Sequence, residues 1–374
     1  QKMAIRSMLD NTHGLISANV AFGKTYVAVD LITRLKKKTL IIVHKESLME
    51  QWIDRILEYT DLARDNIGMI KAEKCEFDKA IVLATPQTLI RRIESSSREF
   101  LKNMYKANFG ITFFDECHIT AAAPAFSLST LAVFSTRVYG LSATITRSDG
   151  LSQLLKWHIG EPIYDDAAFT VKPLVALLDI PIDVGKSRHY IERGTPDGMI
   201  NRYVTVLAKQ KDYLAQVATL MDVCIKQGRN VLVLSAQIKI LNKLYEMSAY
   251  PDKISIIHGQ VKNKDYTKQC LLATTGIFKD GMDVSRLDTL IYATPLTSKN
   301  SLVQSIGRIC RGSSNYPLVF DITNSLYSDI ASMRRYRIGY YKSFGFKIID
   351  IVSVDQAQKL FDNLTQILGV KLDV

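Results

Sequence analysis

Two neighbouring carboxylates, Asp115 and Glu116, stand where the sequence predicts the end of a buried strand. The run before them, residues 111–114, is β-branched and aromatic, and His118 follows two positions after Glu116. Ligands bind at the carboxyl ends of the strands in a parallel sheet, so acids placed there would meet the ligand. Adjacent carboxylates repel each other unless a metal ion binds one and the chemistry uses the other. Taken alone, the pair is more typical of a polar turn, so the interpretation requires a phosphate-binding loop elsewhere.

A candidate phosphate-binding loop lies at residues 18–25, with the sequence Ala-Asn-Val-Ala-Phe-Gly-Lys-Thr. It stands between a short apolar run that predicts a strand and an apolar periodic stretch, residues 26–35, that predicts a helix. In that context backbone N–H groups and a helix N-terminus bind phosphates, Lys24 neutralises them and Thr25 reaches Mg²⁺. The first glycine of the usual pattern is Ala18 here, which leaves a chance Gly-Lys-Thr as the alternative.

Predicted strands alternate with predicted helices through the first half of the chain, which indicates a parallel sheet flanked by helices. Small polar residues follow several of these strands, among them Thr85 and Gln87 after one and residues 142–144 after another. The strands are expected at residues 39–43, 80–83, 109–114, 138–141 and 161–166.

The second half predicts a further α/β unit, in which the connection after His258 is too short for an ordinary crossover between parallel strands. A deletion, or residues absent from this sequence, would explain that shortness. Residues 333–347 interleave basic and aromatic side chains; they fit a stacking surface, but a closing helix and strand with buried aromatic and solvated basic residues is favoured. Strands are expected at 174–182 and 231–234, a polar loop at 185–198, one helix at 201–225 and an amphipathic terminal helix at 355–369.

The length and composition limit the class of protein to which this chain can belong. A chain of 374 residues exceeds one ordinary core, so two domains are expected. The net charge of +11 suggests an acidic partner, with nucleic acid as the leading candidate. No long apolar run or secretion signal is visible, which predicts a cytoplasmic protein without a membrane span. The five scattered cysteines argue against a disulfide framework or a zinc site, and the start at Gln1 without a methionine suggests missing N-terminal sequence.

The motifs together resemble the two motor domains of superfamily 2 helicases. In the first half, the sequence Gly-Lys-Thr is followed by Asp-Glu-Cys-His at 115–118 and Ser-Ala-Thr at 142–144. In the second half, Gln304-Ser-Ile-Gly-Arg-Ile-Cys-Arg fits the family pattern, and residues 271–283 and 231–235 are similar to two further motifs. Arg147, Asp149 and Gly150 extend the Ser-Ala-Thr motif as in the phage UvsW-type branch-migration helicases and the XPB-like group.

The resemblance implies an α/β fold of two tandem RecA-like domains, residues 1–165 and 166–374, with the ATP site in the cleft between them. Lys24 would hold the phosphates of ATP, Thr25 and Asp115 would hold Mg²⁺, and Glu116 would activate water. Contacts to the nucleotide are also expected from the second domain and from the residues around the loop. These are Gln304, Asp283, Arg308 and Arg311 in the second domain, with the two arginines as arginine fingers, and Gln1, Ala21, Phe22, Gly23 and Tyr26 in the first.

The family also implies residues that bind nucleic acid and residues that couple this binding to ATP. His118 would transmit the state of ATP to Ser142 and Thr144, although a histidine hydrogen-bonded only for structure is the alternative. The phosphate backbone would be held without regard to sequence. The candidate residues for that contact are His44, Lys45, Thr85, Gln87, Arg147 and Thr275.

The function expected from this resemblance is that of an ATP-dependent DNA helicase or translocase, acting as a monomer on single-stranded or branched DNA in recombination, repair or replication. An RNA helicase is the nearest alternative, because Asp-Glu-Cys-His also occurs there. A nucleotide-dependent DNA-binding module without unwinding is the third, although Lys24, Glu116 and Arg311 speak against it.

Overall fold

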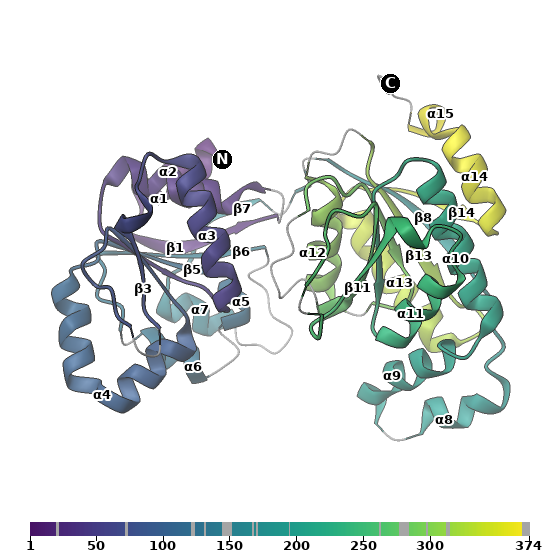
Figure 1. Cartoon of the computed structure of the whole chain (residues 1–374), viewed down its shortest axis with the longest axis horizontal. Coiled ribbons are helices and arrows are strands. Elements are labelled where there is room, and N and C mark those ends of the chain that lie inside the picture. The colour runs from purple at the N-terminus through teal and green to yellow at the C-terminus, as the bar shows by residue number, and fades with distance from the viewer. Residues whose placement is uncertain are drawn as a thin grey trace. The chain divides into compact units, whose positions relative to one another are not determined.

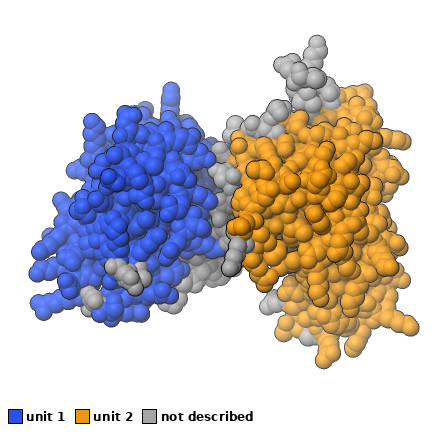
Figure 2. Space-filling view, viewed as in Figure 1, with its two compact units in different colours: residues 1–168 blue, residues 169–374 orange. Residues whose placement is uncertain are grey.

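The computed structural model divides the chain into two compact units, residues 1–168 and 169–374, which are coloured separately in Figure 2. We refer to them as unit 1 and unit 2. The structure describes residues 1–19, 22–71, 74–120, 124–130, 132–143, 152–166, 168–169, 171–193, 195–261, 263–276, 284–296, 298–311 and 315–368. No helix in these ranges is long and apolar enough to cross a membrane.

Unit 1 is a seven-stranded sheet in the order β3-β4-β2-β5-β6-β1-β7, and its strand pairings are parallel in the described residues. The strands are β1 (His13–Ala18), β2 (Thr39–Ile42), β3 (Ile67–Met69), β4 (Ile81–Ala84), β5 (Ile111–Asp115), β6 (Arg137–Ser142) and β7 (Pro162–Asp166). The helices are α1 (Lys2–Asp10), α2 (Lys24–Leu35), α3 (Glu46–Tyr59), α4 (Pro86–Ala107), α5 (Cys117–Thr120), α6 (Pro124–Thr130) and α7 (Ser152–His158), with a 3-10 turn at Arg64–Asn66.

In the central strands of unit 1, such as β2 and β4, alternate residues enter two different apolar clusters. Ile41 of β2 packs with α1, α2 and α3, whereas Leu40 and Ile42 pack on the other face with α4 and Leu155 of α7. Both faces of the sheet are therefore covered by helices (Figure 1), which explains the continuous apolar runs of its strands. Polar side chains are left to the strand ends.

Unit 2 repeats this architecture with the strand order β10-β11-β9-β12-β13-β8-β14, again with parallel pairings where the chain is described. The strands are β8 (Leu174–Asp179), β9 (Val231–Ser235), β10 (Ile254–Ile257), β11 (Cys270–Thr274), β12 (Thr289–Tyr292), β13 (Leu318–Thr323) and β14 (Lys347–Ile351). The helices are α8 (Arg188–Glu192), α9 (Pro196–Leu207), α10 (Lys211–Lys226), α11 (Ile238–Met247), α12 (Lys299–Ile309), α13 (Ser328–Ser343), α14 (Val354–Asp362) and α15 (Leu364–Leu368), with 3-10 turns at Gly185–Ser187 and Pro251–Lys253.

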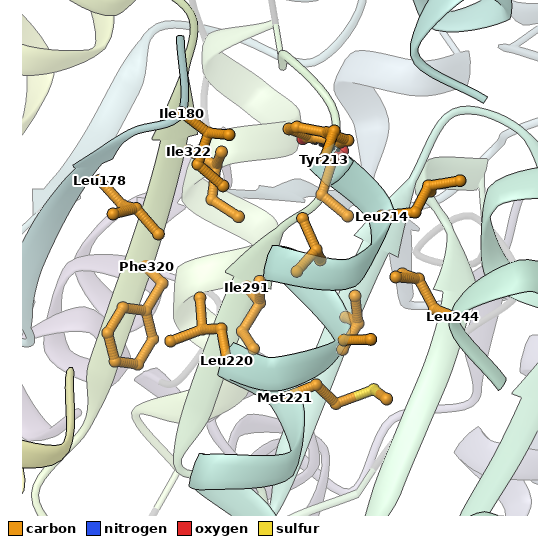
Figure 3. Packing of buried hydrophobic residues seen from close by; sticks show 14 of the residues in the cluster. Leu178, Ile180, Tyr213, Leu214, Leu220, Met221, Leu244, Ile291, Phe320 and Ile322 are labelled. Atoms are coloured by element: carbon orange, nitrogen blue, oxygen red, sulfur yellow. Dashed lines mark hydrogen bonds between the residues drawn. The ribbon is translucent and has the colours of Figure 1, made fainter. Parts of the chain in front are cut away.

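The larger apolar cluster of unit 2 lies between one face of the sheet and the helices α9, α10, α11 and α14. Figure 3 shows its centre, where Leu220 of α10 lies close to Phe320 of β13 and Ile291 of β12. Helices α12 and α13 cover the opposite face with Leu302, Ile306 and Tyr341. The arrangement confirms two α/β units, each with a helix layer on both faces of a parallel sheet.

Several sequence-based expectations for unit 2 are wrong in detail. The predicted helix 201–225 is two helices, because the chain leaves the helical conformation at Gln210 (φ −86°, ψ 98°) before α10 begins. The predicted loop 185–198 contains α8 and the start of α9, where Pro196 occupies the first turn and suits a helix start. The terminal helix 355–369 is broken at Asn363 into α14 and α15.

Residues 333–347 form a helix and the start of a strand, as the favoured interpretation expected, but Arg337 is buried instead of solvated. Its guanidinium donates two hydrogen bonds to Asp321, 2.8 Å from Nε to Oδ2 and 2.7 Å from Nη2 to Oδ1. The hydroxyl of Tyr341 donates to the same carboxylate at 2.9 Å. The basic residue thus ties α13 to the centre of β13.

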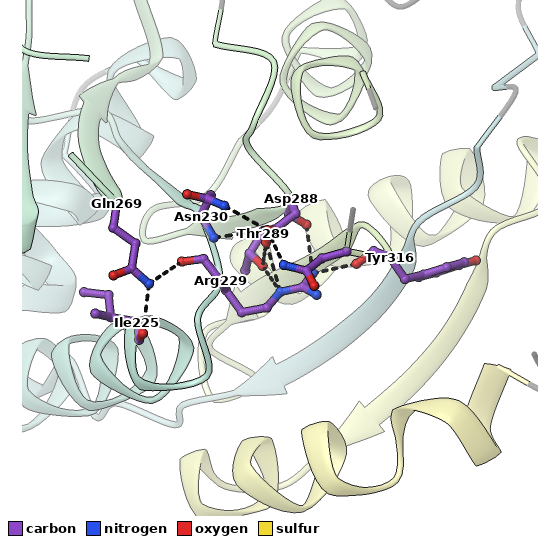
Figure 4. A network of polar contacts seen from close by, with 8 residues as sticks. Ile225, Arg229, Asn230, Gln269, Asp288, Thr289 and Tyr316 are labelled. Atoms are coloured by element: carbon purple, nitrogen blue, oxygen red, sulfur yellow. Dashed lines mark hydrogen bonds and ion pairs between the residues drawn. The ribbon is translucent and has the colours of Figure 1, made fainter. Parts of the chain in front are cut away.

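A second buried ion pair joins the amino ends of the strands in unit 2 (Figure 4). Arg229 lies 2.9 Å from Asp288 and donates to Thr289 Oγ1 at 2.8 Å. The Asp288 carboxylate also accepts hydrogen bonds from the backbone N–H of Asn230 at 3.1 Å and the amide of Asn315 at 3.0 Å. One carboxylate therefore ties together the segments that lead into β9, β12 and β13.

Replacing Asp288 by alanine should lower the free energy of unfolding of unit 2 by about 3–5 kcal/mol, because it leaves the Arg229 charge buried and uncompensated. Urea unfolding followed by far-UV circular dichroism measures the shift. The two tryptophans, Trp52 and Trp157, lie in unit 1, so their emission should report an unchanged transition of that unit.

The matched control is Asp350→Ala, which removes an ion pair to Arg334 whose acidic side chain is 75% exposed. Its effect should stay below about 1 kcal/mol. Equal effects of the two substitutions would contradict the role given to Asp288.

Candidate active site

The polar residues predicted to do chemistry in unit 1 gather at one edge of its sheet. Strands β2, β5, β6 and β1 are parallel neighbours, so their carboxyl ends meet at that edge. Asp115 is the last residue of β5 and is paired with Leu141, next to Ser142 at the end of β6. The loop that carries Lys24 leaves β1 beside them.

The loop between β1 and α2 is closed by the side chain of Lys24, the first residue of α2. Its ammonium group is buried and donates hydrogen bonds to the carbonyl oxygens of Ala18 at 2.8 Å and Asn19 at 3.3 Å. Gly23, just before the helix, has a left-handed conformation with φ 82°, which favours a residue without a Cβ. Thr25 follows, half-buried, in the first turn. This is a strand, loop and helix arrangement suited to bind phosphate.

Other residues expected at the nucleotide surround this loop. The side-chain amide of Gln1 donates to the carbonyl oxygen of Phe22 at 2.8 Å, which fixes the chain's first residue against the loop. The Phe22 ring packs on Tyr164 with centroids 5.5 Å apart. Tyr26 is exposed, and its ring packs edge-on against Tyr59. Ala21 lies outside the described residues.

The carboxylate of Asp115 is held at both oxygens. The backbone N–H of Glu116 donates to Oδ1 at 3.0 Å, and the indole Nε1 of Trp52 donates to Oδ2 at 2.8 Å. Burial and then the charge of Glu116 raise the pKa of Asp115 to about 6, against the opposing effects of Trp52 and Lys24. The two acids thus destabilise each other's ionised forms.

Glu116 is in a left-handed backbone conformation with φ 45°, which is uncommon for a residue with a side chain. Strained residues of this kind concentrate at functional sites. Its carboxylate Oε2 lies 3.3 Å from Nδ1 of His118, and the same nitrogen lies 2.8 Å from the hydroxyl of Ser142. His118 therefore connects the second acid to the end of β6. Thr144, expected to share this contact, and Arg147 lie outside the described residues.

The donor groups suit a magnesium ion that arrives with phosphates. The Thr25 hydroxyl and the Asp115 carboxylate offer oxygen ligands, and Mg²⁺ is usually held by one or two carboxylates with water and substrate phosphates. Among the described residues, no group of three or more His, Cys, Asp or Glu side chains could hold a metal by itself. A bound cation would also relieve the repulsion between Asp115 and Glu116.

The residues expected to bind nucleic acid in unit 1 lie at helix starts on the same edge of the sheet. Thr85 caps α4, since its hydroxyl accepts a hydrogen bond from the N–H of Thr88 at 3.2 Å, and Gln87 is exposed in the first turn. His44 and Lys45 are half-buried before α3.

In unit 2 the predicted site residues lie on two segments. Gln304 and Arg308 are on α12, with Arg308 buried in its last turn, and the half-buried Arg311 follows the helix. Thr275 is half-buried just after β11. Asp283 lies outside the described residues.

Unit 2 also contains a pocket of about 830 Å³ that the sequence did not indicate. It lies beside the ends of β9 and β11, and Lys209 and Lys239 are exposed on its walls. A third lysine, Lys243, donates to the carbonyl oxygen of Ala208 at 2.8 Å. The lining residues come from three separate segments, so no local pattern could have indicated the pocket.

Residues 1–147 match a protein-family model described as "Type III restriction enzyme, res subunit". A viral relative, "Putative ATP-dependent RNA helicase L396" of Acanthamoeba polyphaga mimivirus, is 26% identical over 360 residues, 92% of this chain and 66% of the relative. The chain thus covers slightly less than two thirds of that protein.

Among solved structures, S. cerevisiae Dbp5 bound to RNA and ADP BeF3 matches with a TM-score of 0.65 and 14% identity, over 98% of this chain and 93% of that one. This similarity establishes the fold. T4 UvsW matches with 19% identity over 93% of this chain and 75% of that one. Its TM-score is 0.37.

Replacing Asp115 by asparagine should stabilise unit 1 at neutral pH in the absence of metal. The pKa of Asp115 is about 6 in the folded protein, above its ordinary value of 3.8. Between these two pH values the folded protein keeps a proton that the unfolded chain has released. The free energy of unfolding therefore falls as pH rises from 3.8 through 6. Asparagine escapes this loss and its one carbonyl oxygen can accept from Trp52, but its NH2 group then faces the N–H of Glu116, which offsets part of the gain. The gain should be on the order of 1–3 kcal/mol above pH 7.

Urea unfolding in EDTA, followed by tryptophan emission from pH 5 to 8, measures this difference. The advantage of Asp115→Asn should grow from pH 5 to about pH 6.5 and then stay constant. A difference in stability between the two proteins that does not change from pH 5 to 8 would contradict the electrostatic assignment.

Proposed function

We propose that the chain is a superfamily 2 helicase, a nucleic-acid-stimulated ATPase that unwinds or remodels branched DNA. The observation that carries this proposal is the meeting of Lys24, Asp115, Glu116 and the His118–Ser142 pair at one edge of the unit 1 sheet. A phosphate loop, a metal-binding acid and a second acid are the groups that phosphoryl transfer to water requires.

In this proposal the side chains of unit 1 have separate tasks. Lys24 exchanges its contacts with the loop carbonyls for contacts with the phosphates of ATP. Thr25 and Asp115 hold Mg²⁺, which supplies positive charge to the phosphates. Glu116 accepts a proton from the attacking water, and its contact with His118 orients it.

The arginines of unit 2, Arg308 and Arg311, are proposed to donate to the γ-phosphate during hydrolysis. Arginines in this role contribute on the order of 10³ or more in rate in related systems, so removing one should nearly abolish turnover. Gln304 and Asp283 are proposed to support them. The dependence on both units would allow conformational change to regulate hydrolysis.

Nucleic acid is proposed to bind through its phosphates, without regard to sequence. The net charge of +11 favours such a partner. In unit 1 the proposed contacts are His44, Lys45, Thr85 and Gln87 at the starts of α3 and α4, with Arg147. In unit 2 they are Thr275 and the lysines of the pocket, which lie beside the carboxyl ends of β9 and β11.

Branched DNA is the proposed substrate because Arg147, Asp149 and Gly150 extend the third motif in the manner of branch-migration helicases. RNA is the alternative, favoured by the name of the mimivirus relative and by the RNA bound to Dbp5. A module that binds nucleic acid without unwinding is the third candidate, which the presence of Lys24, Glu116 and Arg311 disfavours.

The substrate proposal predicts that the protein separates strands of forked DNA or moves a Holliday junction in the presence of ATP and Mg²⁺, and acts at least tenfold more slowly on matched RNA duplexes. A panel of labelled forks, junctions, displacement loops and RNA duplexes measures both rates. Lys24→Ala should be inactive on all of them, which controls for contaminating enzymes. Unwinding of RNA alone would establish the alternative, and binding without strand separation would establish the third.

The lysine pocket of unit 2 gives a second prediction. The double substitution Lys209→Ala with Lys239→Ala should weaken binding to DNA of any sequence and reduce the slope of log affinity against log salt by about two, or one for each lost phosphate contact. Fluorescence anisotropy over a range of salt concentrations measures this slope. Lys226→Ala is the matched control, because this exposed lysine ends α10 at the opposite edge of the sheet. An unchanged slope in the double variant would exclude the pocket from the binding surface.

A further inference from the structure

The indole of Trp52 connects α3 to the acidic end of β5. It is 3% exposed, and its Nε1 donates to Oδ2 of Asp115 at 2.8 Å across 63 positions of sequence. The other carboxylate oxygen accepts from the Glu116 backbone at 3.0 Å. With a donor on each oxygen, the carboxylate of Asp115 is fixed in one orientation.

The indole is suited to this contact by its chemistry. An indole N–H is a donor only and carries no charge, so it can complement a carboxylate without competing with a cation for it. A lysine or arginine in the same place would form an ion pair and reduce the attraction of the site for metal. Trp52 therefore orients Asp115 while leaving the acid's negative charge available.

The ring itself is held by the apolar face of α3. Leu48, Met49, Ile53 and Ile56 of this helix are buried in the same cluster as Trp52. Side chains in such a cluster occupy single rotamers and resist displacement. The position of the indole N–H is thus set by the packing of the helix on the sheet.

We propose that Trp52 is a positioning residue that holds Asp115 in the orientation required for Mg²⁺. The proposal rests on the function proposed above, in which Asp115 binds the metal that accompanies ATP. Trp52 touches neither nucleotide nor metal; it acts through the carboxylate.

The substitution Trp52→Phe tests this role because it keeps an aromatic ring in the cluster and removes the donor. The Mg²⁺ concentration for half-maximal ATP hydrolysis should rise about tenfold, a factor expected for the loss of a hydrogen bond to a charged group. At saturating Mg²⁺ the KM for ATP should stay within about twofold, since the phosphate loop is unaltered. A merely structural role would not separate these two constants.

Trp157→Phe is the matched control, because that tryptophan is 72% exposed on α7 and the chemical change is the same. Its Mg²⁺ dependence should equal that of the wild type. A folded Trp52→Phe protein, as judged by circular dichroism and thermal unfolding, with wild-type Mg²⁺ dependence would overturn the proposal. Absence of Mg²⁺-dependent hydrolysis in the wild type would instead overturn the proposed function.

A spectroscopic measurement covers the case in which Trp52→Phe fails to fold. The chain has two tryptophans, so Trp157→Phe leaves Trp52 as the only one. Titration of this variant with Mg²⁺ in the presence of ADP should change the Trp52 emission, with a midpoint equal to that of Mg²⁺-dependent binding of a fluorescent ADP analogue. Binding of the analogue without any change in Trp52 emission would contradict the proposal.

Discussion

The site depends on one geometric constraint, which is that parallel strands end at the same edge of their sheet. Helices cover both faces of each sheet, so its strands are apolar along their length and their ends are left for polar groups. In unit 1 this constraint brings together a loop near the amino terminus, two acids from the middle of the unit and a serine from β6. Local motifs that are weak individually therefore become one site.

Charge balance determines how that site can work. Asp115 and Glu116 repel each other, and the ammonium group of Lys24 and the indole of Trp52 offset only part of the cost. Together with the left-handed backbone of Glu116, this repulsion makes the site less stable than a neutral one would be. Such a site favours binding of a cation together with the phosphates of a nucleotide. Functional sites commonly lower the stability of the folded protein in this way.

The sequence predicted the parallel sheets and the loop between β1 and α2 because these features follow from local patterns. Apolar runs marked β2, β4, β5 and β6 to within a residue or two, and Gly-Lys-Thr marked the start of α2. The break between α9 and α10 was missed because the apolar pattern continues across Gln210. The hydrogen bond of Trp52 to Asp115 and the lysine pocket of unit 2 were missed because they join distant segments, which no spacing rule covers.

We propose that the acids and the loop of unit 1 form an ATPase that responds to nucleic acid. The most direct measurement is the steady-state rate of ATP hydrolysis by the wild type and by Glu116→Gln, in Mg²⁺, with and without saturating single-stranded or forked DNA. Nucleic acid should accelerate hydrolysis by the wild type at least tenfold, and Glu116→Gln should bind ATP but hydrolyse it negligibly under either condition. A wild-type rate that no DNA or RNA changes would contradict it.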